Sequence, residues 1–264
     1  SVASRGLGDV YKRQLRISLN NPSQHNVLSE EMMSDIQSVL DKSANDKSIR
    51  VIVISAEGKT FSAGHDLKQL KKGRLNSDNG KDYFKKIMSK CSKLMQTIVN
   101  NPKPVIAEVN GTATAAGCQL VASCDLAYAS KTATFATPGV NIGLFCHTPQ
   151  VAVSRTIGRK PMMEMLLSGD PIPSDRAVQI GLINSAVDSA ELDGVVQKSC
   201  EDFCKKSAAV ISMGKKSFYR QSEMPLTDAY DFTSAEMVRN LTLNDGKEGI
   251  TSFLEKRDPN WSDD

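Results

Sequence analysis

Short apolar runs of strand length alternate with helical patterns along most of this chain, and this alternation limits the folds that it can adopt. Ile49 to Ser55 is an almost uninterrupted β-branched run, which is typical of a strand covered on both faces. Similar runs predict strands over 15–20, 105–109, 125–129 and 134–136. Parallel strands need crossover segments, so strands separated by helices predict an α/β fold.

The helical segments carry start and stop signals. Ser29 before Glu30 and Glu31 predicts an N-cap with an acidic first turn. A second helix is expected over 82–100, ended by Pro102, after a lysine-rich stretch from Lys68 to Lys81 that we interpret as a surface loop. From His147 onward the pattern is helical almost to the end, with starts near Ser174, Ser189 and Thr227.

These patterns divide the chain into three parts. Residues 1–14 have neither an apolar signal region nor a clear periodicity, so they stay unassigned, as a non-native junction or the remnant of a transit segment. Residues 15–190 form the predicted α/β core. Residues 191–264 form a helical C-terminal region.

Composition excludes several classes of protein. The formal net charge of +3 over 264 residues is too small for a protein that neutralises many nucleic-acid phosphates. The longest apolar runs are strand-sized, so no membrane span is expected. Three histidines without ligand spacing predict no metal site, and six cysteines without a C-x-x-C pair are interpreted as reduced thiols. Gly214 to Ser217 is interpreted as the exposed side of a helix.

Two glycine-containing loops are the candidate site. Phe61 to Asp66 and Asn110 to Gly117 each follow a predicted buried strand and would leave backbone N–H groups unpaired. If the loops lie side by side, their N–H groups could hold one oxygen from two directions, as an oxyanion hole does. The alternative is that both are tight turns with close helix packing. The sequence contains no G-x-S-x-G, P-loop or G-x-G-x-x-G pattern.

Four collinear segments carry a family resemblance from about Leu15 to Trp261. They are FSAGHDLKQL, PVIAEVNGTATAAGCQLVASCDLAYASKTATFATPGVNIG, MMEMLLSGDPIPSDRAVQIGLIN and EGITSFLEKRDPNW, and together they strongly resemble the enoyl-CoA hydratase/isomerase (crotonase) family. The resemblance implies a spiral of ββα turns with a helical C-terminal trimerisation region. It also implies a coenzyme A thioester as ligand, no permanently bound cofactor, assembly as a homotrimer or dimer of trimers, and a mitochondrial location.

The resemblance assigns roles to individual residues. The N–H groups of His65 and Ala116 would hold the thioester oxygen, and Lys256 would reach the nucleotide end of a ligand in a neighbouring subunit. Lysines after the first motif would face the phosphates, whereas Asp66 and Asp125 are interpreted as fixing loops through backbone amides. The expected contacts to the coenzyme A ligand are Ala63, His65, Asp66, Lys68, Ala116 and Lys256.

The chain departs from the family at two positions. Family hydratases carry glutamates where this sequence has Gln119 and Gly139, and neither residue can exchange a proton near neutral pH. The side chains expected nearby are Cys118, Cys146 and His147. The candidate catalytic positions are His65, Ala116, Gln119, Gly139 and Cys146.

Three functions remain open. The leading hypothesis is an acyl-CoA lyase of fatty-acid metabolism that stabilises a thioester enolate, for which ordinary hydration is not expected because both glutamates are replaced. Decarboxylation of a malonyl-type thioester is the alternative within enzymes, since losing carbon dioxide produces the enolate without a base, and the SAGHDL segment also resembles the corresponding loop of methylmalonyl-CoA decarboxylases. A non-catalytic acyl-CoA-binding protein is the third.

Overall fold

The computed structural model describes residues 8–11 and 13–263, which form an α/β core and a projecting helical arm. A six-stranded sheet has the order β1-β2-β3-β5-β7-β10, and a four-stranded sheet has the order β4-β6-β8-β9. The strands of the six-stranded sheet are β1 (Gly8–Tyr11), β2 (Gln14–Leu19), β3 (Val51–Ala56), β5 (Val105–Val109), β7 (Leu126–Ser130) and β10 (Ser185–Val187). Those of the smaller sheet are β4 (Thr60–Ser62), β6 (Thr112–Thr114), β8 (Thr134–Ala136) and β9 (Ile172–Pro173).

Helices follow the strands in chain order. Those of the core are α1 (Glu30–Ala44), α2 (Leu67–Gly73), α3 (Lys81–Asn100), α4 (Ala116–Ser123), α5 (Pro149–Val153), α6 (Arg159–Ser168) and α7 (Ser174–Gln179). The remaining helices are α8 (Leu192–Cys204), α9 (Ala208–Gln221), α10 (Leu226–Thr242) and α11 (Asn244–Glu255). Two short 3-10 helices are η1 (Pro22–Gln24) and η2 (Pro138–Ile142).

The chain winds as a spiral in which each turn adds one strand to each sheet. Three successive turns contribute β3 and β4, then β5 and β6, then β7 and β8, with the first strand of each turn in the large sheet and the second in the small one. Helical structure follows each turn. β2, β3, β5, β7 and β10 pair in parallel, as do β4, β6 and β8. Corresponding turns therefore lie side by side, which brings the segments after β4 and β6 together.

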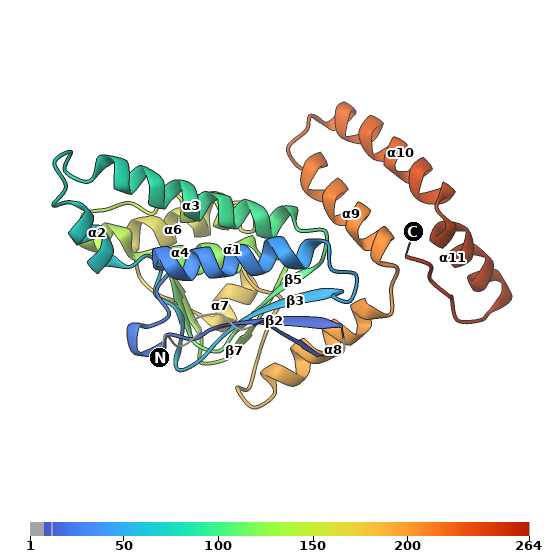
Figure 1. The fold of residues 1–264 in the computed structure, drawn as a ribbon, viewed down its shortest axis with the longest axis horizontal. Helices are drawn as coiled ribbons and strands as arrows, with labels where there is room; N and C mark the ends of the chain where they lie inside the picture. The colour runs from blue at the N-terminus through green and yellow to red at the C-terminus, as the bar shows by residue number, and fades with distance from the viewer. Residues whose placement is uncertain (1–7, 12, 264) are drawn as a thin grey trace.

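The large sheet is covered on both faces, as the apolar strand runs predicted (Figure 1). The main core lies on the side of α1, α3 and α4 and includes Ile52 and Ile54. A second cluster joins Val51 and Val53 of the same strand to α8 on the other side. Alternate residues of β3 thus serve two cores, which explains why the run lacks a polar face.

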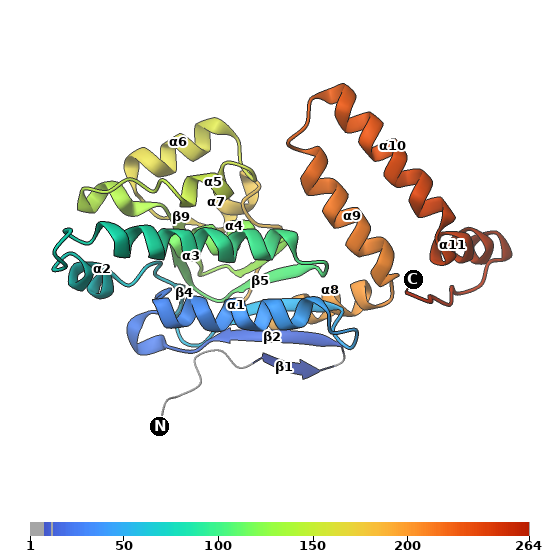
Figure 2. The ribbon, with the colours of Figure 1, turned by 45° about the horizontal axis from the view of Figure 1, so that its top comes forward.

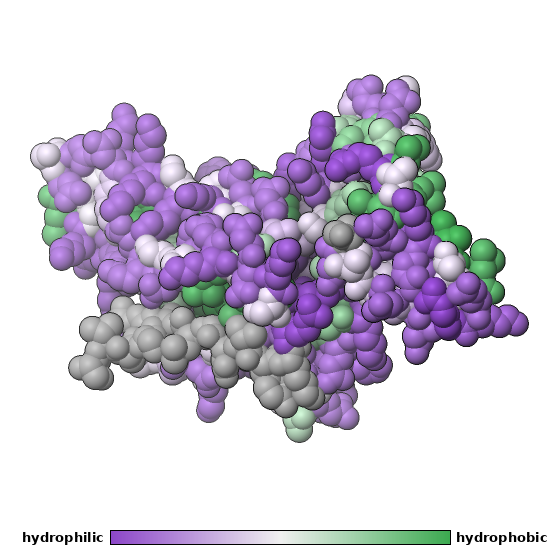
Figure 3. All heavy atoms as spheres, turned by 45° about the vertical axis from the view of Figure 1, so that its right-hand side comes forward, coloured by the Kyte–Doolittle hydropathy of each residue, from purple (hydrophilic) through white to green (hydrophobic). Residues whose placement is uncertain are grey.

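Helices α9, α10 and α11 form an arm that projects from the core (Figures 1 and 2). Hydrophobic residues gather over this arm on the right of Figure 3. In helices α10 and α11, the side chains of Leu226, Tyr230, Phe253 and Leu254 are each more than two-thirds exposed in the single chain. Such a surface is larger than isolated apolar side chains produce and is typical of a protein interface.

The structure corrects one predicted element and adds another. Leu67–Gly73 is helix α2 and not a loop, because Asp66 caps it by accepting hydrogen bonds from the N–H groups of Lys68 and Gln69. Gly8–Tyr11, in the unassigned stretch, pairs antiparallel with β2, while residues 1–7 and 12 lie outside the described part. The predicted Ser29 cap of α1 is confirmed, since its side chain accepts from the Met32 N–H.

Candidate functional site

The two glycine-containing loops lie in direct contact. A Cβ built on Gly64 would lie 3.0 Å from the amide nitrogen of Ala116 and 3.0 Å from the Cβ of Ala115. A Cβ on Gly117 would lie only 2.2 Å from the carbonyl oxygen of Ser62. Both positions therefore require glycine, and their close approach brings the peptide between Gly64 and His65 beside the start of α4.

The start of α4 forms one side of this contact. Ala116 is the first residue of α4, so its N–H has no intrahelical acceptor. Ala115 before it has a φ of +49°, a positive value that residues other than glycine rarely adopt, at the point where the chain turns into the helix. Residue 65 forms a parallel bridge with Leu28, whose N–H donates to the Gly64 carbonyl at 2.7 Å.

The His65 imidazole is held neutral by its surroundings. Burial lowers the pKa of His65, and the Leu28 backbone opposes this shift only in part. Neither ring nitrogen has a hydrogen-bond partner within the described residues, and both nitrogens are shielded from solvent. The ring therefore contributes polar atoms without a positive charge.

Gln119 lies one helical turn after Ala116 and is 4% exposed. Its Oε1 lies 3.9 Å from the Cys91 Sγ of α3, at the outer limit of a thiol hydrogen bond. Burial raises the pKa of Cys91 to about 12, so this neighbour is an uncharged thiol. The environment around Gln119 is consequently apolar and neutral.

Gly139 lies in η2 and contacts Cys146. Its N–H donates to the Cys146 Sγ at 3.4 Å. Burial raises the pKa of Cys146, and it raises that of Cys118 to about 12 with a further contribution from the neighbouring Cys146. Cys118 precedes Gln119 on α4, and the pKa directions leave both Cys118 and Cys146 as uncharged thiols near neutral pH.

His147 does not belong to this buried group. It is exposed, and its ring lies 5.2 Å from that of Phe145, centroid to centroid. The structure therefore places His147, which the sequence predicted to lie near Gln119 and Gly139, on the surface.

The proposed coenzyme contacts fall in two places. Ala63 donates its N–H to the His25 carbonyl at 3.0 Å, and Lys68 is an exposed residue of α2 whose Nζ lies 3.1 Å from the Gln24 Oε1. Lys256 follows α11, an element that Figure 1 shows at the opposite end of the molecule from α2. Lys256 and the two loops are thus not brought together within one chain.

Asp125 fixes a loop, as predicted, but it also holds an unpredicted ion pair. Its Oδ2 accepts from the Val105 N–H at 2.7 Å and from the Lys215 Nζ at 2.6 Å, and its Oδ1 accepts from the Tyr219 hydroxyl. The Lys215 side chain is only 8% exposed, so the expectation of an exposed helix side at 214–217 is wrong for this residue. Helix periodicity could have revealed this, because Lys215 and Tyr219 are four residues apart and share a face.

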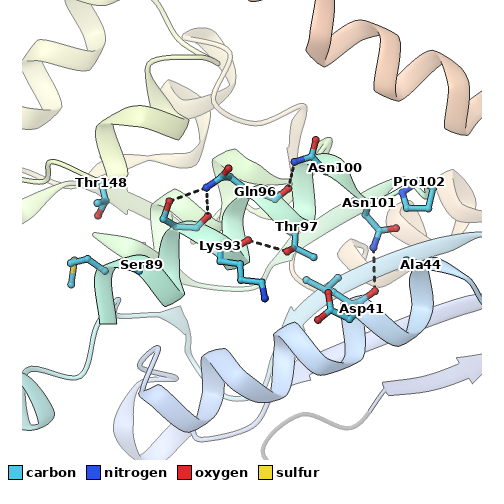
Figure 4. A pocket seen from close by; sticks show the side chains of 13 residues that line it. Asp41, Ala44, Ser89, Lys93, Gln96, Thr97, Asn100, Asn101, Pro102 and Thr148 are labelled. Atoms are coloured by element: carbon cyan, nitrogen blue, oxygen red, sulfur yellow. Dashed lines mark hydrogen bonds between the residues drawn. The ribbon is translucent and has the colours of Figure 1, made fainter. Parts of the chain in front are cut away.

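A groove of about 680 Å³ lies between α1 and α3, and none of its lining residues belongs to the two loops (Figure 4). Its side chains largely bond to their own helix. Thr97 donates to the Lys93 carbonyl and Asn100 to the Gln96 carbonyl. These groups do not converge on a common point, so the groove is a poor candidate for the chemistry.

Comparisons with known proteins decide the family. The sequence pattern of enoyl-CoA hydratase/isomerase proteins matches residues 11–264. This chain belongs to that family. It is 49% identical to enoyl-CoA hydratase domain-containing protein 3, mitochondrial, of Xenopus laevis over 247 residues, covering 94% of this chain and 82% of the relative. The human protein of the same name is 49% identical over 246 residues, covering 93% and 80%.

Solved structures of the family have the same crotonase fold. The crystal structure of human enoyl-CoA hydratase domain-containing protein 3 has a TM-score of 0.92 at 47% identity, covering 97% of this chain and all of the other. An enoyl-CoA hydratase from Mycobacterium smegmatis gives 0.92 at 41% identity, covering 97% and 98%. The predicted fold class, a spiral of ββα turns followed by C-terminal helices, is confirmed.

The described part of the chain contains neither a metal-binding cluster nor a membrane-spanning helix. Residues 8–11 and 13–263 contain no group of three or more metal-ligating side chains placed to hold an ion. Within the same ranges no helix is long and apolar enough to cross a membrane.

Proposed function

We propose that this protein binds coenzyme A thioesters and stabilises a thioester enolate with the backbone N–H groups of His65 and Ala116. The observation that supports the proposal is the close approach of Gly64 to the amide nitrogen of Ala116, because His65 directly follows Gly64 in the chain. The positive end of α4 adds to the attraction for an oxyanion. Each such donor contributes about 3 kcal/mol to lowering a barrier.

The side chains around this point favour chemistry that needs no base. Gln119 and Gly139 do not titrate, burial lowers the pKa of His65, and burial raises those of Cys118 and Cys146. No carboxylate is therefore available at either replaced position to activate water. Ordinary enoyl-CoA hydration should be slow in such a neutral site.

Decarboxylation of a malonyl-type thioester is the reaction that we infer from this neutrality. The bond between Cα and the carboxylate carbon breaks, carbon dioxide leaves, and the electron pair remains in the enolate, whose oxygen accepts from the two N–H groups. The α-carbon then takes a proton supplied by water. The alternative is an acyl-CoA-binding protein that keeps the hole without turnover.

The remaining features of the proposal concern ligand contacts and assembly. Lys68 would face the coenzyme phosphates. Lys256 would reach the nucleotide end of a ligand in a neighbouring subunit, since it follows α11, which lies far from α2 in the same chain (Figure 1). The exposed apolar residues of the arm support a homotrimer or a dimer of trimers. No further cofactor enters the proposed reaction.

The names of the relatives support a location. Enoyl-CoA hydratase domain-containing protein 3 of Xenopus laevis, human and rat is named mitochondrial. We propose a mitochondrial location and a role in fatty-acid metabolism for this chain.

A substrate panel tests the proposal. Crotonyl-, malonyl- and methylmalonyl-CoA are each incubated with the protein, products are identified by mass spectrometry, and binding is measured by calorimetry. The proposal expects binding of all three and loss of carbon dioxide from the malonyl-type thioesters. Binding without any product would support the acyl-CoA-binding alternative, and no binding at millimolar concentrations would contradict the proposal.

A further inference from the structure

Two polar side chains near the proposed oxyanion hole have buried atoms without a hydrogen-bond partner. Within the described residues, neither the two ring nitrogens of His65 nor the Thr137 Oγ1 have a donor or acceptor, and all three atoms are shielded from solvent. Thr137 as a whole is 0% exposed. Buried polar atoms in proteins are normally paired, because an unpaired one costs free energy. These atoms therefore mark positions at which a ligand could supply the missing partner.

The small sheet places the two residues at one edge. β4, β6 and β8 are parallel neighbours in that order, and His65 and Thr137 follow the carboxyl ends of β4 and β8. Between them, Gly64 lies against Ala115, whose N–H donates to the Ala136 carbonyl at 2.9 Å. Two strand spacings thus separate the backbone at residue 64 from that at residue 137, with the start of α4 between them. The carboxyl edge of a parallel sheet is where α/β proteins commonly bind ligands.

Both side chains can donate a hydrogen bond. Thr137 carries one O–H, and the imidazole of His65, which burial keeps neutral by lowering its pKa, carries one N–H. A carboxylate has two oxygens that only accept, so one anionic group can pair with both donors. An alkyl group of the same shape would leave both donors unpaired. The positive end of α4 between them adds to the attraction for an anion.

We propose that the His65 imidazole and the Thr137 hydroxyl are specificity-determining groups that together bind an anionic substituent on the acyl part of a thioester. This inference rests on the proposed function, which it deepens by naming the substrate class: acyl-CoA with a carboxylate near the thioester carbonyl, in preference to a saturated acyl chain. His65 then acts on one ligand in two ways, with its backbone N–H on the thioester oxygen and its ring on the acyl substituent.

Calorimetry with two thioesters of matched shape tests this recognition. Sulfoacetyl-CoA carries a sulfonate that cannot leave as carbon dioxide, and isovaleryl-CoA carries a branched alkyl group in the same place. The natural protein should bind sulfoacetyl-CoA at least about tenfold more tightly, as expected for hydrogen bonds to a charged group. Thr137→Val, which replaces the hydroxyl by a methyl group, and His65→Phe, which removes both ring nitrogens, should each reduce the preference to below about threefold.

Two control variants separate recognition from packing. Thr137→Ser keeps the hydroxyl and should keep the preference. Thr112→Val makes the same change in the same sheet, where the Thr112 hydroxyl already pairs with that of Thr134 at 3.1 Å, and should also keep it. If the Thr137 hydroxyl only fills the core, Thr137→Val leaves the preference unchanged.

Nitrogen NMR adds a readout that packing alone would not change. The ring nitrogen signals of His65 should shift with sulfoacetyl-CoA and not with isovaleryl-CoA, with the exposed ring of His147 as reference. Equal affinities of the natural protein for the two thioesters, or a preference kept by Thr137→Val or by His65→Phe, would overturn the inference, as would its loss in Thr112→Val. If His65→Phe does not fold, Thr137→Val decides.

The same titrations distinguish the two levels of the argument. Absence of binding to either thioester at millimolar concentrations would contradict the proposed function itself. Binding of both thioesters with equal affinity would leave the proposed function standing and overturn only the role of the two side chains.

Discussion

Lys215 of α9 and Asp125 before β7 form an ion pair of 2.6 Å, with side chains only 8% and 17% exposed. The same Nζ donates to the carbonyls of Ile98 and Lys103 at 3.0 and 2.9 Å. All three hydrogens of the ammonium group are thus used, and α9 is fastened to the core at the point where α3 ends and β5 begins.

Replacing one member of this pair should destabilise the protein. Lys215→Met leaves the Asp125 carboxylate buried with less compensation, so the free energy of unfolding should fall by about 3 kcal/mol. Lys216→Met, at the exposed neighbouring position, should stay within about 0.5 kcal/mol. Urea denaturation followed by circular dichroism measures both, and equal effects would contradict a structural role for the pair.

Stability should depend on pH through His65. Its pKa is lowered in the folded protein, so below about 6.5 the unfolded chain binds a proton that the folded chain does not, and stability falls as the pH decreases towards the folded value. His65→Asn should flatten this dependence, whereas His147→Asn, at an exposed position, should not. Melting temperatures between pH 5 and 7.5, a range chosen around the ordinary histidine pKa, measure the difference.

Hydration by the unmodified protein should be slow. Neither Gln119 nor Gly139 can exchange a proton, so the rate with crotonyl-CoA should lie at least roughly a hundredfold below that of a family member carrying both glutamates. The absorbance of the enoyl thioester follows the reaction directly. A rate equal to that of the glutamate-bearing enzyme would show that another group performs the acid and base steps.

The apolar arm should mediate assembly. Light scattering should give a mass of about three or six times the 28.7 kDa of one chain. Phe253→Glu, at a position that is 81% exposed in the single chain, should reduce this mass by placing a charge in the interface. Thr251→Glu on the same helix is a control for added charge, and a monomeric natural protein would contradict the assembly proposed here.

The sequence predicts the main architecture because the buried strands are nearly continuous apolar runs. Ile49 to Ser55 identifies β3 within two residues, and Ser29 identifies the start of α1. Short elements were harder to predict from the sequence. β4 and β6 have three residues each, too few for a periodicity to show, and α2 was hidden by a lysine-rich composition although Asp66 gave a capping signal.

The two loops of the candidate site could be located in the sequence, but the contacts between them and between distant side chains could not. Gly64 and Gly117 mark the loops in the sequence, but their contact depends on parallel pairing between β4 and β6. The closeness of Gly139 and Cys146 depends on the η2 turn, and the Asp125–Lys215 pair joins residues 90 positions apart. Such long-range contacts leave no periodic signal in a single sequence.

Infrared spectroscopy of a bound thioester tests the central claim most directly. Acetyl-CoA labelled with carbon-13 at the thioester carbonyl should show a lower carbonyl stretching frequency when bound, because two N–H groups polarise the bond. Ala116→Pro deletes one N–H at the first helical position, and Ala116→Ser keeps it. The account predicts a shift with the natural protein and with Ala116→Ser that is reduced in Ala116→Pro. A bound thioester whose carbonyl frequency equals that in water, or is unchanged by Ala116→Pro, would contradict it.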